Sequence, residues 1–468
     1  MITFLKRIKA AFLRKGRPGG YREIMLIAYP LIIMSAGHTV MQFFDRKFLA
    51  ANSTVDVAAA LPAGILSFSM FCFFMVSANF TSALVAQAWG AKKADDCVKS
   101  CWNGFYFGLG AAILITFVLP PLGEYFIIKA NHSPELTVRE VEYFNILMPG
   151  GAFICMGAPF FAFFSGRGLT LRVAIVNTAT CTLNILLNWI FIFGHWGSPA
   201  MGIFGAGLGT SLSSMVAFLC ALTMFLMEKQ ELFKTRRIRL PDKKLLGTLI
   251  SRGTPSGFQC LCDVGSFTVV TFLIGHLGQV PMAATTIALS VNALSFLPLL
   301  GTSDATSIVV GQYIGSEQLD ISEAAAKRAW KLATCYMVIC SSCYIFLPDL
   351  LIGWFSPDST NGSFREVLEV GRFLLVCAAI FNFFDATKFI FMGALRGAGD
   401  TRAMMLISIS CAWLLLAPGV WLLLKVFNAD IKTIWIYITA FIAFESALIY
   451  LRFRTGAWRK LRLIEKEA

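Results

Sequence analysis

Charged residues occur inside several long apolar stretches of the sequence, and their types suggest reversible ion binding. Asp385 lies in FNFFDATKFIFMGALRGAGDTR (381–402), and Asp263 lies in an earlier apolar stretch. A charge near the centre of a bilayer costs roughly 2.5–3.5 kcal/mol on an insertion scale, so such residues are functional candidates by default. Two carboxylates in one low-dielectric cavity repel each other, so one is expected to hold a proton or a cation. The alternative is that both are hydrogen-bonded packing groups.

Two further charged residues accompany this acidic pair. Lys388 follows Asp385 by three residues and shares a helix face with it. Its ammonium could neutralise Asp385 or Asp304 as a tethered cation, or its stem could reach toward water at the membrane surface. Asp304, in GTSDATS, could join the same cavity or lie nearer one rim of the membrane.

The N-terminal half has its own polar residues in apolar surroundings. Asn184 and Asn188 lie one helical turn apart and therefore share a face. Asp45 is followed at once by Arg46 and Lys47, so it could also form a salt bridge at the membrane surface. His38 titrates near neutral pH, although a single histidine is more often a hydrogen-bonded packing residue.

The composition indicates an integral membrane protein built from helices. Of 468 residues, 57% are hydrophobic and 14% charged, and the mean hydropathy is +0.70. The apolar runs are long and continuous rather than alternating, which favours helices over a barrel of strands. The net charge of +13 does not indicate nucleic-acid binding, because the basic residues lie in short loops and both tails. We expect an all-α polytopic protein in a lipid bilayer.

Hydropathy predicts twelve membrane spans. They are expected at residues 24–50, 57–87, 99–128, 137–164, 169–194, 201–227, 244–275, 280–311, 323–353, 366–395, 401–427 and 431–452. Placing both tails and every second loop on one side gathers most of the 40 Lys and Arg residues there, which predicts that both termini are cytoplasmic. The segment FLKRIKAAFLRK (4–15) is expected to form a basic amphipathic helix on the membrane surface, or a disordered basic tail.

The two halves of the chain resemble each other at an offset near 225 residues. VAQAWGAKKADD (85–96) aligns with VGQYIGSEQLDI (310–321), and, after a short insertion, SGRGLT (165–170) aligns with RGAGDT (396–401). An even number of helices in each repeat predicts two pseudo-symmetric six-helix bundles of the same orientation. The expected parts are an N-terminal segment (1–23), a first lobe (24–227), a cytoplasmic linker (228–243), a second lobe (244–452) and a cytoplasmic tail (453–468).

The sequence resembles the multidrug and toxic compound extrusion (MATE) family over nearly its whole length. The resemblance rests on FFDRKFLA, VAQAWGA, FSGRGLT, NILLNWIFIFG and GAGLGTSLS, and above all on FFDATKFIFMGALRGAGDTR. Members of this family are antiporters that expel organic, often cationic, compounds in exchange for sodium ions or protons. The resemblance therefore implies transport coupled to sodium ions or protons, without a bound cofactor.

The resemblance also implies roles for individual residues. Asp263 and Asp385 are similar to the acidic pair of the branch whose coupling site lies in the C-terminal half, which makes them candidate sodium ligands. Asp45, Asn184, Asn188 and Thr210 match polar positions of a second proton or substrate site. Three residues depart from the pattern: Asn188 stands where some relatives have an acid, Lys388 where a neutral amide is common, and Asp304 is unexpected.

We therefore expect a cation-coupled exporter of amphipathic, cationic organic molecules, in the inner or plasma membrane of the cell. A flippase or exporter of a lipid-linked or other amphiphilic metabolite is the alternative, and a cavity rich in Arg or Lys would favour it. An enzyme is not expected, because the spans contain no HExxH or GxSxG motif and no clustered His/Asp set. The expected partners are small organic substrates and lipid, with no nucleic acid, and the protein is expected to be a monomer.

Overall fold

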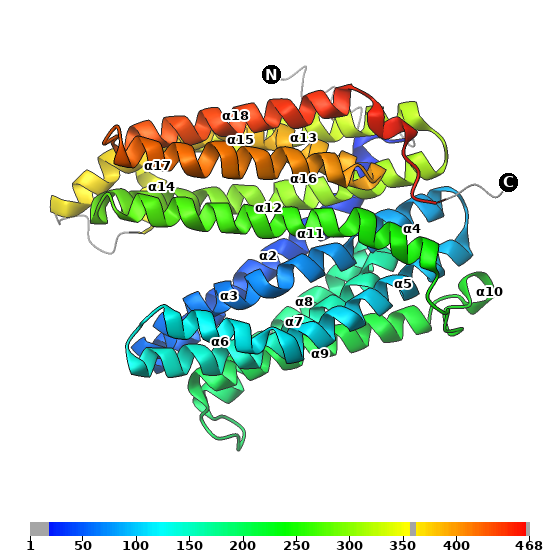
Figure 1. The fold of residues 1–468 in the computed structure, drawn as a ribbon, viewed down its shortest axis with the longest axis horizontal. Coiled ribbons are helices and arrows are strands. Elements are labelled where there is room, and N and C mark those ends of the chain that lie inside the picture. Colours follow the sequence, from blue (N-terminus) through cyan, green and yellow to red (C-terminus); the bar gives the residue numbers. More distant parts are fainter. Residues whose placement is uncertain (1–17, 356–361, 465–468) are drawn as a thin grey trace. The chain divides into compact units, whose positions relative to one another are not determined.

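A computed structural model describes residues 18–355 and 362–464, whose regular secondary structure is entirely helical (Figure 1). The elements are α2 (Tyr21–Asn52), α3 (Thr54–Asn79), α4 (Thr81–Gly90), α5 (Ala94–Ile113), η1 (Leu114–Val118), α6 (Pro120–Lys129), α7 (Pro134–Gly166), α8 (Thr170–Phe193), α9 (Gly202–Leu226), α10 (Gln230–Phe233), α11 (Lys243–Gly275), α12 (Gln279–Gly315), α13 (Leu319–Phe346), α14 (Pro348–Gly353), α15 (Gly362–Ala398), α16 (Thr401–Ser410), η2 (Cys411–Leu416), α17 (Ala417–Lys425), α18 (Ile431–Arg454) and η3 (Ala457–Lys460). The segments η1 and η2 are π-helical, and η3 is a 3₁₀ turn.

The predicted membrane spans are confirmed in number. Twelve helical segments are long and apolar enough to cross a membrane. Two of them end earlier than the sequence predicts, because short helices begin at Pro120 and Pro348 instead of continuing the spans to residues 128 and 353. Proline lacks a backbone N–H and starts a helix more readily than it continues one. The predicted amphipathic helix at residues 4–15 lies outside the described residues.

The described chain forms two compact units. Unit 1 comprises residues 18–28, 262–310, 318–355 and 362–461, and unit 2 comprises residues 29–261, 311–317 and 462–464. The helices α2, α11 and α12 each contribute residues to both units.

One long helix forms the centre of each half. In unit 2, α7 packs against α3, α5 and α9, and 61% of its most apolar stretch is buried. In unit 1, α15 packs against α13 and α18, and 50% of its most apolar stretch is buried. In every other span a smaller share of the most apolar stretch is buried. These two helices, the fourth span of each half, are therefore the most buried ones.

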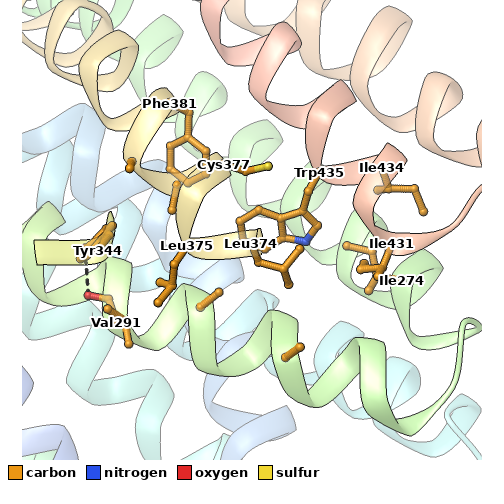
Figure 2. Close-up of a cluster of buried hydrophobic side chains, with 14 of the residues drawn as sticks. Ile274, Val291, Tyr344, Leu374, Leu375, Cys377, Phe381, Ile431, Ile434 and Trp435 are labelled. Atoms are coloured by element: carbon orange, nitrogen blue, oxygen red, sulfur yellow. Dashed lines mark hydrogen bonds between the residues drawn. The ribbon is translucent and has the colours of Figure 1, made fainter. Parts of the chain in front are cut away.

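The core around α15 contains the aromatic and aliphatic side chains shown in Figure 2. Leu374, Leu375 and Phe381 of α15 pack with Trp435 of α18, and each is at most 4% exposed. The Tyr344 hydroxyl of α13 donates a hydrogen bond to the carbonyl oxygen of Val291 on α12 at 3.2 Å. Burying such side chains stabilises the unit by about 1.5–3 kcal/mol each if they leave water. These contacts hold α12, α13, α15 and α18 together.

The turns that follow equivalent spans have the same backbone conformation in both halves. Gly168 and Gly399 have φ angles of 82° and 85°, in the left-handed region that glycine adopts without strain. The next residues, Leu169 and Asp400, have φ/ψ of −87°/45° and −86°/44°. These pairs occupy the positions that the SGRGLT and RGAGDT alignment predicts, so the pseudo-symmetric repeat is confirmed at the level of the backbone.

A second pair of equivalent turns also has the same backbone conformation in both halves. Lys92 and Glu317 have positive φ angles of 59° and 63°. Beyond each turn a side chain bonds back to the preceding helix: Cys97 Sγ to the Val85 carbonyl oxygen at 3.7 Å, and Ser322 Oγ to the Val310 carbonyl oxygen at 3.4 Å. The two repeats therefore use the same local contact with different donors.

Two glycines at equivalent positions permit a close helix crossing within unit 2. A Cβ atom added at Gly90 would lie 1.9 Å from the carbonyl oxygen of Gln312, and one added at Gly315 would lie 2.0 Å from the carbonyl oxygen of Gln87. Any side chain at either position would clash with backbone. Beside this crossing, Gln312 Nε2 donates to the Gly166 carbonyl oxygen at 2.8 Å, and the Leu463 N–H donates to Gln87 Oε1 at 2.9 Å.

The segment after α9 is anchored by Arg167. Its guanidinium lies over the rings of Trp89, Phe163 and Phe233, at 5.2, 4.8 and 4.2 Å from their centroids. Glu228 accepts from its Nη2 atom at 3.3 Å. Burial lowers the pKa of Arg167, whereas the charge of Glu228 favours the protonated form. The contact fixes α10 against the end of α7.

Candidate cation-binding sites

Three helices bring the predicted polar residues of the N-terminal half together. Asn188 Nδ2 on α8 donates to Asp45 Oδ1 on α2 at 2.6 Å, and to Asn184 Oδ1 at 3.3 Å. Asn184 Nδ2 donates in turn to the hydroxyls of Thr210 and Ser213 on α9, both at 3.2 Å. The single turn between the two asparagines lets one amide chain connect the carboxylate to the hydroxyls.

This N-terminal-half site contains an oxygen that no protein group satisfies. Asn188 is fully buried, and its Oδ1 atom has no hydrogen-bond partner among residues 18–355 and 362–464. A Cβ atom added at Gly209 would lie 2.1 Å from that oxygen, so only glycine lets α9 approach it so closely. A buried amide oxygen without a donor is costly unless something else binds it. Together with the Asp45 carboxylate it offers oxygen ligands to a cation.

The structure also shows the surroundings of Asp45 and His38, for which the sequence left alternatives open. Asp45 forms no ion pair with Arg46 or Lys47 within the described part of the chain, where its bonded partner is Asn188. His38 is exposed on α2, two turns before Asp45 along the same helix. It makes no side-chain hydrogen bond to Asp45, Asn184 or Asn188 in the network described above.

In the C-terminal half, Lys388 forms a buried ion pair with Glu445, which was not predicted from the sequence. Lys388 Nζ on α15 donates to Glu445 Oε2 on α18 at 2.7 Å. The two side chains are 14% and 3% exposed. The packing of α18 against α15 places Glu445 opposite the lysine. The direct partner of Lys388 is therefore neither Asp385 nor Asp304, the two carboxylates considered from the sequence.

The predicted acidic pair lies around the same ammonium group. Lys388 interacts electrostatically with Glu445, Asp263 and Asp385. Asp385 is 7% exposed and lies one turn before Lys388 on α15, whereas Asp263 lies on α11. Asp263, Asp385, Lys388 and Glu445, which we call the C-half charge cluster, thus come from three helices of unit 1. The cluster contains three carboxylates and one ammonium, which is bonded to Glu445.

Asp304 belongs to a different contact. Its Oδ1 atom accepts a hydrogen bond from Arg396 Nη1 at 2.9 Å. Arg396 lies three turns beyond Asp385 on α15, about 16 Å along the helix axis. Asp304 therefore lies near the glycine-rich turn at the end of α15, bonded to Arg396 rather than to Lys388.

Two contributors to these sites were missed from the sequence. Glu445 lies within a predicted span, in the segment FIAFESALIY, and a buried lysine needs an acidic partner. Searching the spans for that partner would have found it. Ser213 had no such signal, because hydroxyl residues are common in membrane helices and usually bond to their own backbone.

Residues 18–355 and 362–464 contain no group of three or more His, Cys, Asp or Glu side chains that could hold a metal ion. A sodium site at Asp263 and Asp385 remains a prediction.

Twelve spans in two equivalent halves, each with a carboxylate-containing polar site, define a class of membrane transporter. The MatE family profile matches residues 30–190 and 255–422, one segment in each half, and the chain belongs to this family. Its members are transporters rather than enzymes. Thr210, Ser213 and Glu445 lie outside the matched residues, whereas the other site residues lie inside them.

Named relatives match along nearly the whole chain. A probable multidrug resistance protein NorM of Pseudomonas putida is 28% identical over 453 residues, covering 95% of this chain and 96% of the relative. The NorM of Thermotoga maritima is also 28% identical, over 95% of both chains. The multidrug resistance protein PmpM of Pseudomonas aeruginosa is 27% identical, over 84% of this chain and 81% of its own.

Solved structures share the fold. A multidrug resistance MATE family transporter in an outward-facing conformation superposes with a TM-score of 0.83 at 19% identity, over 97% of this chain and 99% of that chain. The eukaryotic MATE transporter AtDTX14 superposes with a TM-score of 0.80 at 18% identity, over 94% and 96% of the two chains. The all-helical architecture predicted from the sequence is therefore confirmed.

Proposed function

We propose that the chain is a secondary active antiporter that exports amphipathic, cationic organic compounds in exchange for sodium ions or protons by alternating access. The observation that carries this proposal is the carboxylate site of the C-terminal half, where Asp385 and Glu445 are buried and, with the partly buried Asp263, outnumber the single Lys388. Net negative charge in a low-dielectric interior attracts cations strongly. The names of the relatives, multidrug resistance proteins, support drug-like cargo.

The coupling step follows from competition for the same carboxylates. Asp385 and Asp263 can each bind a proton covalently or a sodium ion through oxygen, and a cationic substrate neutralises the same charge. When the coupling ion binds, the substrate loses its electrostatic partner and is released on the opposite side of the membrane. The substrate and the coupling ion therefore need not touch each other, because coupling requires only that each weakens the binding of the other.

The N-terminal half supplies a second polar site in the proposal. Asp45 provides charge, and the unsatisfied Asn188 Oδ1 atom provides a neutral oxygen. Asn184 and Thr210 hold these groups in place through their hydrogen bonds. Because Asn188 carries no charge, this site binds cations more weakly than a pair of carboxylates would.

The expected setting completes the proposal. Both termini face the cytoplasm of a cell whose inner or plasma membrane holds the protein, because basic residues cluster in the tails and in alternate loops. The two lobes are residues 24–227 and 244–452, joined by the linker 228–243 and flanked by the segments 1–23 and 453–468. The working unit is a monomer that contacts lipid and small organic substrates and no nucleic acid, since both candidate sites are complete within one chain.

Reconstituted vesicles test the proposed function. Purified protein is inserted into vesicles loaded with ethidium, and a sodium gradient, a proton gradient or no gradient is imposed. Uphill ethidium movement that requires one gradient and stops with the matching ionophore is the expected result. Movement of a fluorescent lipid without any dependence on an ion gradient, and no movement of ethidium, would favour the flippase alternative instead.

A further inference from the structure

The stretch of chain that leads from α10 into α11 turns two large apolar side chains outward (Figure 1). Ile238 is 71% exposed and Leu240 is 84% exposed, whereas Arg239 between them is partly buried. A single exposed apolar side chain on a loop needs no explanation. Two of them on one side of a segment, next to a membrane span and among basic residues, indicate a contact with another molecule.

Hydrogen bonds fix which side of this segment faces the protein. The Tyr106 hydroxyl on α5 donates to the carbonyl oxygen of Arg239 at 2.8 Å, and the guanidinium of Arg239 bonds to Asp95 on the same helix. Arg239 is thus attached to α5 through both its backbone and its side chain. The exposure of Ile238 and Leu240 on either side of it shows that these two side chains point away from that attachment.

The segment lies beside the boundary between the charged and the apolar part of a membrane span. The Asp242 N–H donates to Asn103 Oδ1 on α5 at 2.9 Å. The charged residues of α5 lie in its first turns, where Lys99 pairs with Asp95 at 3.0 Å and with Asp96 at 3.7 Å. Asn103 follows Lys99 by one turn and begins the uncharged part of the helix. The segment therefore returns to the level at which headgroups meet acyl chains when α5 crosses a bilayer.

Cations accompany the two apolar side chains. Four of the seven residues from Lys234 to Leu240 are basic, and none is acidic. Lys234 and Arg237 are exposed and form no ion pair within the described part of the chain. Arg236 is also exposed, and its bond to the Leu226 carbonyl oxygen, at 3.2 Å, uses only the Nε atom. The orientation of a membrane protein accounts for such charges, but not for apolar side chains turned outward among them.

We propose that residues 234–240, which we call the linker arm, form a binding site for an anionic phospholipid. Arg236 and Arg237 bind the phosphate, whose oxygens match the paired N–H groups of a guanidinium. Ile238 and Leu240 contact the upper part of the acyl chains. Basic residues beside an apolar edge are the combination by which protein segments bind anionic membrane surfaces. Lipid binding at the linker arm depends on neither the cargo nor the coupling ion, so it can fail while the proposed function stands.

Native mass spectrometry of the purified chain in detergent measures the affinity for single lipid molecules. Dioleoylphosphatidylglycerol is the anionic probe, and dioleoylphosphatidylcholine, which has no net charge, is the comparison. Arg236→Gln combined with Arg237→Gln is expected to weaken phosphatidylglycerol binding about 25-fold, because each basic residue at an anionic surface contributes about fivefold. Phosphatidylcholine binding is expected to stay unchanged.

A matched control removes the same charge elsewhere. Arg454 and Lys460 are exposed basic residues at and beyond the end of α18, and they form no ion pair within the residues that the structure describes. Arg454→Gln combined with Lys460→Gln is expected to leave phosphatidylglycerol binding unchanged. The substituted side chains of the linker arm are exposed, so its variants are expected to melt at the temperature of the native protein.

A soluble headgroup separates a phospholipid site from a site for free phosphate. The native chain is expected to bind sn-glycerol 3-phosphate at least about tenfold more weakly than dioleoylphosphatidylglycerol, because the soluble molecule brings no apolar surface to Ile238 and Leu240. Ile238→Ser combined with Leu240→Ser is expected to weaken binding of the lipid about threefold, since detergent already covers part of the apolar surface. Binding of glycerol phosphate is expected to be the same in this variant.

Loss of phosphatidylglycerol binding in the arginine variant, with normal binding in the control variant, supports the site. Equal weakening in both variants overturns it, because the charge effect is then not specific to the linker arm. Equal affinity of the native chain for phosphatidylglycerol and phosphatidylcholine overturns it as well. Glycerol phosphate that binds as tightly as the lipid overturns the phospholipid assignment and leaves a general anion site.

Discussion

Replacing Gly90 or Gly315 by alanine is expected to force apart the helices that cross at these residues. The added methyl group would lie 1.9 Å from the Gln312 carbonyl oxygen or 2.0 Å from the Gln87 carbonyl oxygen. An ordinary contact needs at least 3.4 Å, so the backbones must separate by about 1.5 Å in either variant. The obstacle is backbone, and therefore no change of rotamer relieves it.

The expected loss of stability can be estimated from the contacts at the crossing. Overpacking typically costs about 1–3 kcal/mol. The same displacement weakens the hydrogen bonds that Gln312 donates to Gly166 and that Gln87 accepts from Leu463, each contributing about 1 kcal/mol. We expect a loss of about 2–5 kcal/mol for either variant. The double variant is expected to lose less than the sum, because either methyl group already opens the shared contact.

Thermal unfolding of the detergent-solubilised protein measures this effect. The apparent melting temperature is expected to fall by roughly 2–5 °C in each single variant, because in a chain of this length each kcal/mol shifts it by about 1 °C. Gly64→Ala and Gly110→Ala are the controls, because nothing lies within 4 Å of a Cβ atom added at either position. Alanine favours helix, so these controls are expected to be neutral or slightly stabilising. A Gly90→Ala protein with the same melting temperature as the native protein would refute the close crossing.

Three further predictions concern the N-terminal-half site, the linker and a helix terminus. Asn188→Asp places a second carboxylate beside Asp45, so one of the two is expected to hold a proton. Ethidium flux in vesicles should then respond more steeply to a pH gradient than it does with the native protein. An unchanged response would show that this site takes no part in coupling. Arg167→Gln removes three ring contacts and one of the two arginines bonded to Glu228. Arg172→Gln removes the other arginine, bonded to Glu228 at 2.8 Å from a side chain that is 52% exposed, so limited proteolysis should cut residues 228–243 several times faster in Arg167→Gln than in this control. Asp430→Ala removes the N-cap of α18 and is expected to cost about 1 kcal/mol at neutral pH. Hydrogen bonds from Thr433 lower the pKa of Asp430 below its usual 3.8, so this contribution is complete above pH 3.8 and is lost as the pH falls through the lower folded value. The melting temperatures of native and variant protein should therefore converge in acid, and a constant difference would contradict the capping role.

The helical architecture was predictable because membrane helices have a strong sequence signal. Long apolar runs define twelve spans, and the two pairs of matching motifs predict equivalent turns, which Gly168 and Gly399 confirm with nearly equal φ angles. Span ends were less predictable. Pro120 and Pro348 start new helices inside apolar stretches, and hydropathy alone does not register that interruption.

The candidate sites were predictable only in part. Asn184 and Asn188 follow from helical spacing, and the resemblance to MATE transporters links them with Asp45, which the structure places 2.6 Å from Asn188. The partner of Lys388 did not follow, because spacing along α15 indicates only neighbours on the same helix. Glu445 reaches the lysine from α18, a contact set by packing between helices distant in the sequence.

The position of Asp304 stayed open from the sequence. Lys388 is the partner considered from the sequence, and Arg396 lies about two turns further along α15. Helix register decides between them, and the structure pairs Asp304 with Arg396 at 2.9 Å. Register between helices depends on many side-chain contacts at once, such as the close approach of Gly393 to Ser303, and a single sequence does not define it.

Ion-coupled flux by an Asp385→Asn protein tests the central claim most directly. The substitution removes the charge of a buried carboxylate while keeping its shape, and Asp349→Asn, at an exposed position, is the matched control. In vesicles with an imposed sodium or proton gradient, the account predicts uphill ethidium export by the native and Asp349→Asn proteins. It predicts none by Asp385→Asn, which should elute from size exclusion like the native protein. Full gradient-driven export by Asp385→Asn would contradict a coupling site in the C-terminal half.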